Sequence, residues 1–226
     1  METVTIAVSD TEEMLPGTSF GLNNLQLIDM DEPAARILDA VSGQIYSPLG
    51  DMVHTLEKGG SPAQQAAALN VIFDKVILVE RIKDLSRTTI PLTISLKPGD
   101  QLHHANKQLI ISIGDIKYSN FTLFNLGSDG TINFLDPHTE SPFNDSLTID
   151  IGKAYELPLK VKPPFGADHF VAITSRKPML ELHKELKSVD GQTNPAKVTK
   201  ILEKYLIADA DRQVGVHGVF TTGVLP

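Results

Sequence analysis

The sequence predicts an α+β protein: an antiparallel β-sandwich of immunoglobulin-like type, with a long packed helix before it and two helices near the C-terminus. Two runs joined by Asp129-Gly130 alternate apolar and polar residues, as the arms of a β-hairpin do. From residue 88 onward, short apolar runs recur at the spacing of about 8 to 12 residues that is typical of an antiparallel sandwich or barrel. A long helical pattern begins at Ser61-Pro62.

Composition indicates an ordinary globular protein. The chain has 226 residues, of which 41% are apolar and 21% are charged, so it is long enough to bury a sizeable core. Its net charge is -8 and it has no block of Lys and Arg, which argues against nucleic acid as a partner. The chain has no Cys, which excludes disulfides, thiolate metal sites and a cysteine nucleophile.

The N-terminal residues show no targeting pattern. No positively charged stretch is followed by an apolar run, as a secretory signal requires. No run approaches the roughly 18 apolar residues of a membrane span. We therefore expect a cytoplasmic protein without a membrane span.

Residues 1–60 are predicted to form a small α/β or irregular N-terminal segment, separate from a helix-plus-sandwich domain over 61–226. The alternation over 2–8 predicts a strand, and the next twenty residues, rich in Gly, Pro and Asn, predict an irregular connection.

Two further segments precede the boundary, which we place between residues 43 and 61. Residues 32–41 predict a short helix, because Asp31 can cap it and Pro33 suits its first turn. Residues 43–60 predict a loop with at most one more helical turn.

The clearest helix is expected over 61–85, where Ser61 can serve as N-cap and Pro62 as the first helical residue. A wide apolar stripe at helical spacing predicts that this helix packs on the β-rich remainder. The stripe consists of Leu69, Ile72, Phe73, Val76 and Val79.

The rest of the chain alternates predicted strands with turns and then returns to helix. Two helices are predicted over 178–186 and 195–206, and a last strand over 213–221. The earlier strands are predicted at 89–95, 108–113, 121–126, 131–135, 146–151, 155–161 and 169–174.

Metal binding is the first chemistry to consider. His103-His104 lies three residues after Asp100, and imidazole with carboxylate can hold zinc or another divalent ion. Adjacent histidines point to opposite sides of an extended chain, however, which favours a solvated polar loop over a chelating pair. His138 beside Asp136 and His169 beside Asp168 are weaker candidates still. We therefore predict no metal-ligating residue and no cofactor.

No motif specific for catalysis is present. The sequence has no G-x-S-x-G elbow for a nucleophile and no glycine-rich phosphate loop. We interpret the glycosylation patterns at Asn120 and Asn144 as chance. The run 163–166, PPFG, is a proline-rich motif that an aromatic groove could bind, but a rigid corner between two strands explains it better.

Three segments carry a resemblance to a known family: LFNLGSDGTINFLDP, LPLKVKPPFGADHFVAITSRKP and VGVHGVFTT. Together they resemble the domain of unknown function DUF4384, over about residues 88–222. Members of that family often follow a caspase-like peptidase domain in bacterial proteins. Leu135-Asp136-Pro137 departs from the family, which more often has an apolar residue followed by Pro-Asn.

The resemblance implies a role beside a peptidase rather than as one. Caspase-like catalysis needs a Cys nucleophile, which this chain lacks, and His217-Gly218 mimics the peptidase base without a partner. The expected function is a non-catalytic binding or regulatory module, either the C-terminal part or a partner of a bacterial caspase-like peptidase, and therefore not an enzyme. The alternative is a hydrolase or metal-dependent enzyme that uses loop His and Asp residues.

Overall fold

The structure is a computed structural model that describes residues 4–9, 25–28, 36–39, 42–47, 52–56, 61–135, 148–206 and 211–223. The chain divides into two compact units, residues 1–77 and 78–226, and the division falls inside the long helix α2, Pro62–Thr88. Each unit is described by itself. The domains predicted from the sequence, 1–60 and 61–226, have a different boundary and remain a prediction.

The first unit contains a mixed five-stranded sheet in the order β2-β1-β3-β4-β5. Strand β1 pairs in parallel with β2 and β3, whereas β3, β4 and β5 pair antiparallel. The strands are β1 Val4–Ser9, β2 Leu25–Ile28, β3 Arg36–Asp39, β4 Gln44–Tyr46 and β5 Met52–Thr55.

Three sequence predictions for this unit are wrong within the described residues. The helix predicted over 32–41 is strand β3 at Arg36–Asp39, where pairing with β1 and β4 overrides a weak helical pattern. The loop predicted over 43–60 contains the hairpin of β4 and β5. The irregular connection contains β2.

The second unit is α+β, with antiparallel and mixed sheets in an arrangement compatible with a β-sandwich. Its helices are the second half of α2, α3 Leu180–Lys187 and α4 Pro195–Leu206. Its strands are β6 Ile90–Pro91, β7 Thr93–Lys97, β8 His103–His104, β9 Gln108–Gly114, β10 Asn120–Leu126, β11 Ile132–Phe134, β12 Tyr155–Lys160, β13 Ala167–Ser175 and β14 Arg212–Thr222.

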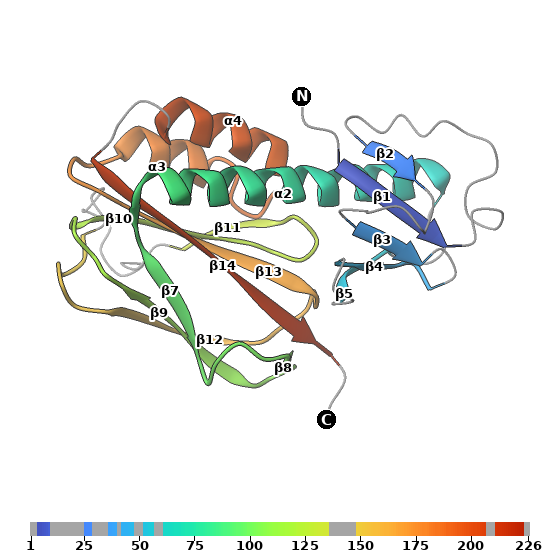
Figure 1. Cartoon of the computed structure of the whole chain (residues 1–226), viewed down its shortest axis with the longest axis horizontal. Helices are drawn as coiled ribbons and strands as arrows, with labels where there is room; N and C mark the ends of the chain where they lie inside the picture. The colour runs from blue at the N-terminus through green and yellow to red at the C-terminus, as the bar shows by residue number, and fades with distance from the viewer. Residues whose placement is uncertain are drawn as a thin grey trace. The chain divides into compact units, whose positions relative to one another are not determined.

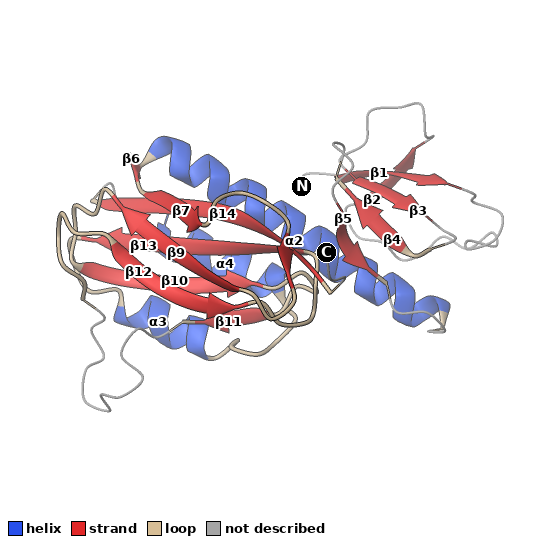
Figure 2. Cartoon of the chain, turned by 90° about the horizontal axis from the view of Figure 1, so that it is seen from below, coloured by secondary structure: helices blue, strands red, loops and turns tan. Residues whose placement is uncertain are grey.

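The strands of this unit form two sheets, which we call the central sheet and the outer sheet. The central sheet has the order β11-β10-β13-β14-β6, with β8 paired to β14, and the outer sheet has the order β12-β9-β7. Figures 1 and 2 show the helices on one side of the central sheet and the outer sheet on the other. The central sheet is therefore covered on both faces.

Each face of the central sheet has its own apolar core, and β10 contributes to both. Phe124 and Leu126 belong to the core beneath the helices, with Leu186 of α3 and Leu202 of α4. Phe121 and Leu123 belong to the core between the sheets. The two sets alternate along β10 because successive side chains of a strand point to opposite faces.

Helix α2 begins where the sequence predicts a helix. The Ser61 hydroxyl accepts a hydrogen bond from the Gln64 N–H, and the Gln64 side chain accepts one from the Ser61 N–H, which is a capping box. Leu78, Val79 and Ile82, in the second half of the helix, supply the residues that pack in the core of the second unit. Of the predicted docking stripe, Val79 packs in this core, whereas Leu69, Ile72 and Phe73 belong to the first unit.

The β10–β11 hairpin turns at the predicted residues. Gly130 has φ of +84°, a left-handed conformation that glycine adopts without strain and that a tight turn requires. The Thr131 N–H donates to the Asp129 carboxylate at 2.9 Å, and the Gly127 N–H donates to the Thr131 carbonyl at 2.7 Å. The turn thus satisfies its own backbone groups.

The loop between α3 and α4 covers the outer edge of β11. The Ile132 N–H donates to the Gln192 carbonyl at 3.0 Å, and the Ile132 carbonyl accepts from the Gly191 N–H at 2.7 Å. An edge strand with paired backbone groups is closed to further strand pairing.

Two segments of the second unit differ from expectation. The strand predicted over 146–151 is wrong for its described residues, which form an isolated bridge at Thr148 followed by a turn. Strand β8 lies where a polar loop is predicted. Among the described residues, no helix is long and apolar enough to cross a membrane.

Candidate functional site

The central sheet changes character along the face that it turns towards the outer sheet. Phe121 and Leu123 are buried between the sheets, but the next residue of β10 on this face is Asn125, which is only partly buried. Asn133 of β11 lies directly opposite Asn125, and Phe170 of β13 lies on its other side. The apolar face of the sheet therefore gives way to a polar one at the hairpin end.

A groove of about 550 Å³ opens at this end, and we call it the strand-end groove. This volume lies within the range of about 300 to 1,000 Å³ that is usual for ligand sites. Apolar residues from both sheets line it, namely Leu109, Leu135, Leu159, Val161, Phe170 and Val219. Four of them, Leu109, Val161, Phe170 and Val219, also belong to the core between the sheets, so the groove exposes the end of that core.

The polar lining of the groove carries charges of both signs. Asp129 lies in the hairpin turn and Asp168 in β13, whereas Lys160 ends β12 and Lys162 follows it. Both lysines are exposed, and the two aspartates are partly buried. The groove can therefore hold a ligand that has apolar parts and charges or dipoles of both signs.

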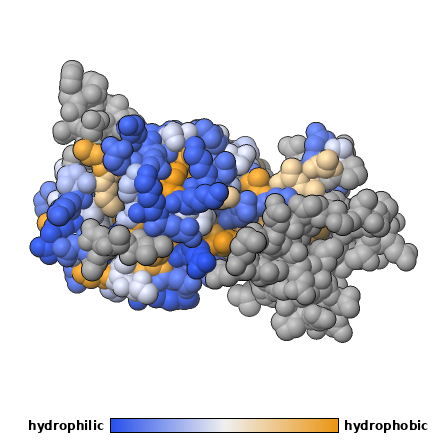
Figure 3. All heavy atoms as spheres, turned by 90° about the horizontal axis from the view of Figure 1, so that it is seen from above, coloured by the Kyte–Doolittle hydropathy of each residue, from blue (hydrophilic) through white to orange (hydrophobic). Residues whose placement is uncertain are grey.

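A second hollow, of about 200 Å³, lies between α2 and α4. Its apolar lining is Leu78, Ile82 and Leu85 from α2 and Leu202 from α4. Figure 3, which looks onto this side of the second unit, shows hydrophobic atoms between hydrophilic ridges. The hollow is smaller than the ligand sites usual in proteins, which start at about 300 Å³.

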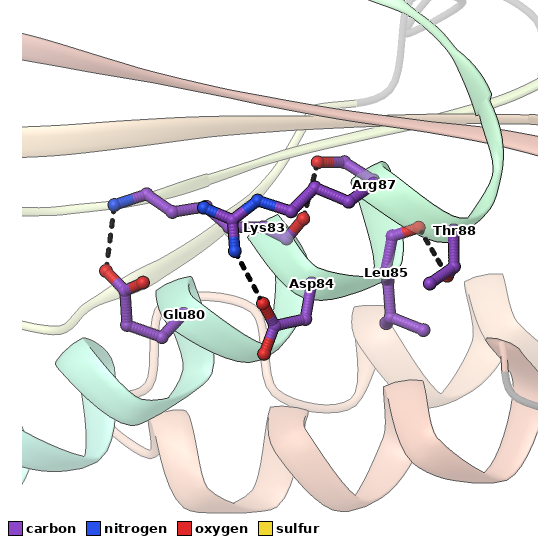
Figure 4. Close-up of polar contacts among 7 residues, drawn as sticks. Glu80, Lys83, Asp84, Leu85, Arg87 and Thr88 are labelled. Carbon is purple, nitrogen blue, oxygen red and sulfur yellow. Dashed lines mark hydrogen bonds and ion pairs between the residues drawn. The ribbon is translucent and has the colours of Figure 1, made fainter.

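The polar residues of α2 near this hollow pair along their own helix. Glu80 contacts Lys83 at 2.8 Å and Asp84 contacts Arg87 at 2.7 Å, as Figure 4 shows. All four side chains are exposed, so each pair adds little to stability. We therefore take the strand-end groove as the candidate site.

The structure places His103 inside the protein, so the solvated polar loop predicted for it is wrong. Its side chain is 3% exposed, and β8 pairs in parallel with the end of β14, with His103 opposite Thr221. Burial lowers the pKa of His103, while a backbone hydrogen bond at Gly99 and the charge of Asp100 act in the opposite direction. His104 is more exposed, as the alternation of adjacent histidines predicts.

Acid should destabilise the protein through His103. Because the folded pKa is lowered, the unfolded chain binds a proton more readily, so the stability contribution is present above the unfolded pKa of about 6.5 and is lost as pH falls below it. Chemical denaturation at a series of pH values should therefore show a flatter acid limb for His103→Gln than for wild type. His104→Gln is the control, and an unchanged pH dependence in His103→Gln would contradict this assignment.

The other histidines singled out in the sequence do not come together in the described residues. His217 of β14, which was expected to have no partner, contacts Asp100 through its Nε2 at 2.9 Å, so that expectation is wrong. His169 lies in β13 opposite Gly218. Within the described ranges, no cluster of at least three His, Asp or Glu side chains is arranged to hold a metal ion. Asp136 and His138 lie outside these ranges.

Two of the remaining sequence motifs, at Asn120 and over 163–166, make hydrogen bonds within the fold. Asn120 is 9% exposed and its amide donates to the carbonyls of Ser175 and Arg176, so it is a poor acceptor for a glycan. Asn144 lies outside the described residues. The run 163–166 lies between β12 and β13, and Gly166 exchanges backbone hydrogen bonds with Thr221 of β14. Its prolines line the groove.

Of the groove residues, the sequence singled out as candidate sites only Asp168, a weak metal candidate, and the prolines of the run 163–166, and it predicted no site there. Asn125 and Asn133 lie eight residues apart in a predicted hairpin, so their direct opposition could have been derived from the turn position. The position of Lys160 and Lys162 at the groove could not have been derived from the sequence, because it depends on how the two sheets stack. Comparison of the chain with protein-family models, curated proteins and solved structures gives no match.

Proposed function

We propose that the chain is a non-catalytic binding or regulatory module that holds an extended segment of a protein partner in the strand-end groove. One observation carries the proposal: an apolar floor and polar groups of both charges meet at the open end of two stacked sheets. A peptide segment offers apolar side chains and backbone dipoles in the same combination.

The proposed partner is a bacterial caspase-like peptidase domain, by resemblance to DUF4384. Support comes from where the segments that carry the resemblance lie. The hairpin turn contributes Gly127 and Asp129 to the groove, the proline corner contributes Pro164, and β14 contributes Val219 and Thr221. These segments are far apart in the sequence but line one surface, as they would if that surface were a binding site.

The proposal includes an immunoglobulin-like strand arrangement for the second unit. The order β7-β9-β12 matches strands A-B-E of such a domain, and the order β11-β10-β13-β14 matches strands C′-C-F-G. Helices α3 and α4 would then be an insertion between strands F and G. The groove would lie at the end of the sandwich that holds the C–C′ turn and the E–F connection, opposite the B–C and F–G loops with which immunoglobulin variable domains bind.

Binding of a caspase-like peptidase domain from the same genome tests the proposal. We expect the purified full chain to bind this domain in a calorimetric titration, and Lys160→Glu with Lys162→Glu to weaken binding about tenfold, or about 1.4 kcal/mol, by reversing two charges at the groove. Lys200→Glu is the matched control, since Lys200 is exposed on α4.

Each outcome of this titration decides one part of the proposal. Absence of binding by wild type would contradict the partner, and equal binding by the double variant and the control would contradict the groove. Stoichiometric zinc in the purified chain, or peptide cleavage lost on changing one histidine, would instead support the hydrolase or metal-dependent alternative.

A further inference from the structure

Two asparagines face each other in the strand-end groove. Asn125 of β10 and Asn133 of β11 are directly opposite across the hairpin, and the Asn133 Nδ2 donates to the Asn125 Oδ1 at 3.1 Å. Both side chains line the groove and both are partly buried. The hairpin therefore presents a joined pair of side-chain amides to whatever enters the groove.

This pair has one amide nitrogen and one carbonyl oxygen left over. In the part of the chain that the structure describes, neither the Asn125 Nδ2 nor the Asn133 Oδ1 has a hydrogen-bond partner. Exchanging the oxygen and nitrogen of both amides would leave the same combination of one donor group and one acceptor. The pair thus presents a donor and an acceptor side by side.

Stability alone does not explain asparagine at these positions. Asn is disfavoured in strands, and aromatic or β-branched pairs stabilise a hairpin better than two amides do. Apolar residues occupy the preceding positions on this face of β10, Phe121 and Leu123. The change to Asn occurs where β10 lines the groove.

A donor beside an acceptor is the complement of one residue of an extended chain, whose main-chain N–H and C=O point to the same side. The neighbouring floor residue Phe170, opposite Asn125 on β13, is apolar and can receive an adjacent side chain. Two aspartates and two lysines line the groove, so their formal charges cancel and a phosphate backbone gains no net attraction there. These features favour a peptide over a nucleotide.

We propose that the Asn125–Asn133 pair binds the main-chain N–H and C=O of one residue of the bound extended segment, while a neighbouring apolar side chain of that segment lies on the groove floor at Phe170. This assignment rests on the proposed function, namely that the groove receives an extended peptide segment. It makes the two asparagines the residues that recognise the main chain of the segment, whatever the segment's charged residues are.

The test uses small neutral probes and the full chain. In an NMR titration, N-acetyl-leucine N-methylamide should shift the side-chain amide signals of Asn125 and Asn133, with a dissociation constant in the millimolar range. N-acetyl-N-methyl-leucine dimethylamide keeps the carbonyls and the leucine side chain but has no N–H, so it should bind about tenfold more weakly. Equal binding of the two probes, or no shift of either amide, would overturn the assignment.

Two variants complete the experiment, one in the asparagine pair and one control outside the groove. Asn125→Asp keeps an acceptor for the Asn133 amide and removes the donor left over, so it should weaken binding of the first probe about tenfold. Asn194→Asp carries the same charge change and keeps an acceptor for the Lys197 N–H at the start of α4, so its binding should match wild type. Equal loss in both variants would overturn the assignment.

The outcomes separate the two proposals. Peptidase binding without discrimination between the probes would leave the proposed function standing and remove the role of the asparagines. Discrimination between the probes without peptidase binding would leave a peptide-reading groove and remove the proposed partner. Adenosine, whose base can also pair with an asparagine amide, is the third probe, and tighter binding of adenosine than of the first probe would overturn the choice of a peptide.

Discussion

Gln213→Ala is expected to lower the free energy of unfolding by about 3 to 5 kcal/mol, because it removes four hydrogen bonds of a fully buried side chain, one to a buried hydroxyl and three to partly buried backbone groups. The Gln213 side chain is fully buried in β14. Its Oε1 accepts from the Lys117 N–H at 2.7 Å and from the Thr174 hydroxyl at 2.9 Å. Its Nε2 donates to the carbonyls of Pro91 and Asp115, each at 2.8 Å.

These four bonds join β14 to three other segments of the second unit. Pro91 lies in β6, Thr174 in β13, and Asp115 and Lys117 in the connection from β9 to β10. A single amide thus holds an edge strand, a central strand and a crossing loop together. An amide suits this position because it supplies two donors and an acceptor with two lone pairs.

Chemical denaturation measures the effect, with Gln101→Ala as the control because Gln101 is exposed. The control should change stability by less than about 0.5 kcal/mol. Gln213→Glu keeps the shape but places a carboxylate oxygen against two carbonyl oxygens, so it should also be strongly destabilising. A Gln213→Ala variant as stable as the control would refute the role given to this side chain.

Phe124→Ala is expected to cost about 3 to 5 kcal/mol, since it opens a cavity in the core between the central sheet and the helices. The side chain is fully buried and packs in the same cluster as Ile82 of α2 and Leu186 of α3. The unfolding midpoint in denaturant reports the loss.

A substitution of the neighbouring residue, Leu123, tests whether the opposite face of the central sheet is covered as well. Leu123→Ala should cost about 2 to 5 kcal/mol as well, because Leu123 is fully buried in the core on the opposite face. Leu102→Ala, at a side chain that is 53% exposed, is the control. If either Phe124→Ala or Leu123→Ala matched the control, one face of β10 would be open to solvent, and the layer arrangement would be wrong.

Local chemistry in the sequence is sufficient for the features that depend on neighbouring residues. The start of α2 follows from Ser61 and Pro62, and the hairpin turn follows from Asp129-Gly130. The proline run at 163–166 predicts the corner between β12 and β13. Each of these signals acts within four or five residues, so no tertiary contact is needed to interpret it.

Features that depend on distant partners were missed or assigned wrongly. Residues 36–39 carry a helical pattern but form β3, since hydrogen bonding to β1 and β4 outweighs a small propensity difference. His103 belongs to a polar stretch but is buried, because β8 pairs with the end of β14, more than a hundred residues away in the chain. Thr122 looks like the polar side of an alternating strand, yet it is buried against His183 of α3.

The sequence by itself determined the turns, the helix starts, most strands of the second unit, and the absence of any thiol chemistry. Only the tertiary structure decided that the central sheet is covered on both faces, and that the hairpin, the proline corner and the last strand meet at one groove. The physical reason is that turn and capping preferences are local, whereas burial and the shape of a groove depend on which distant segments pack together.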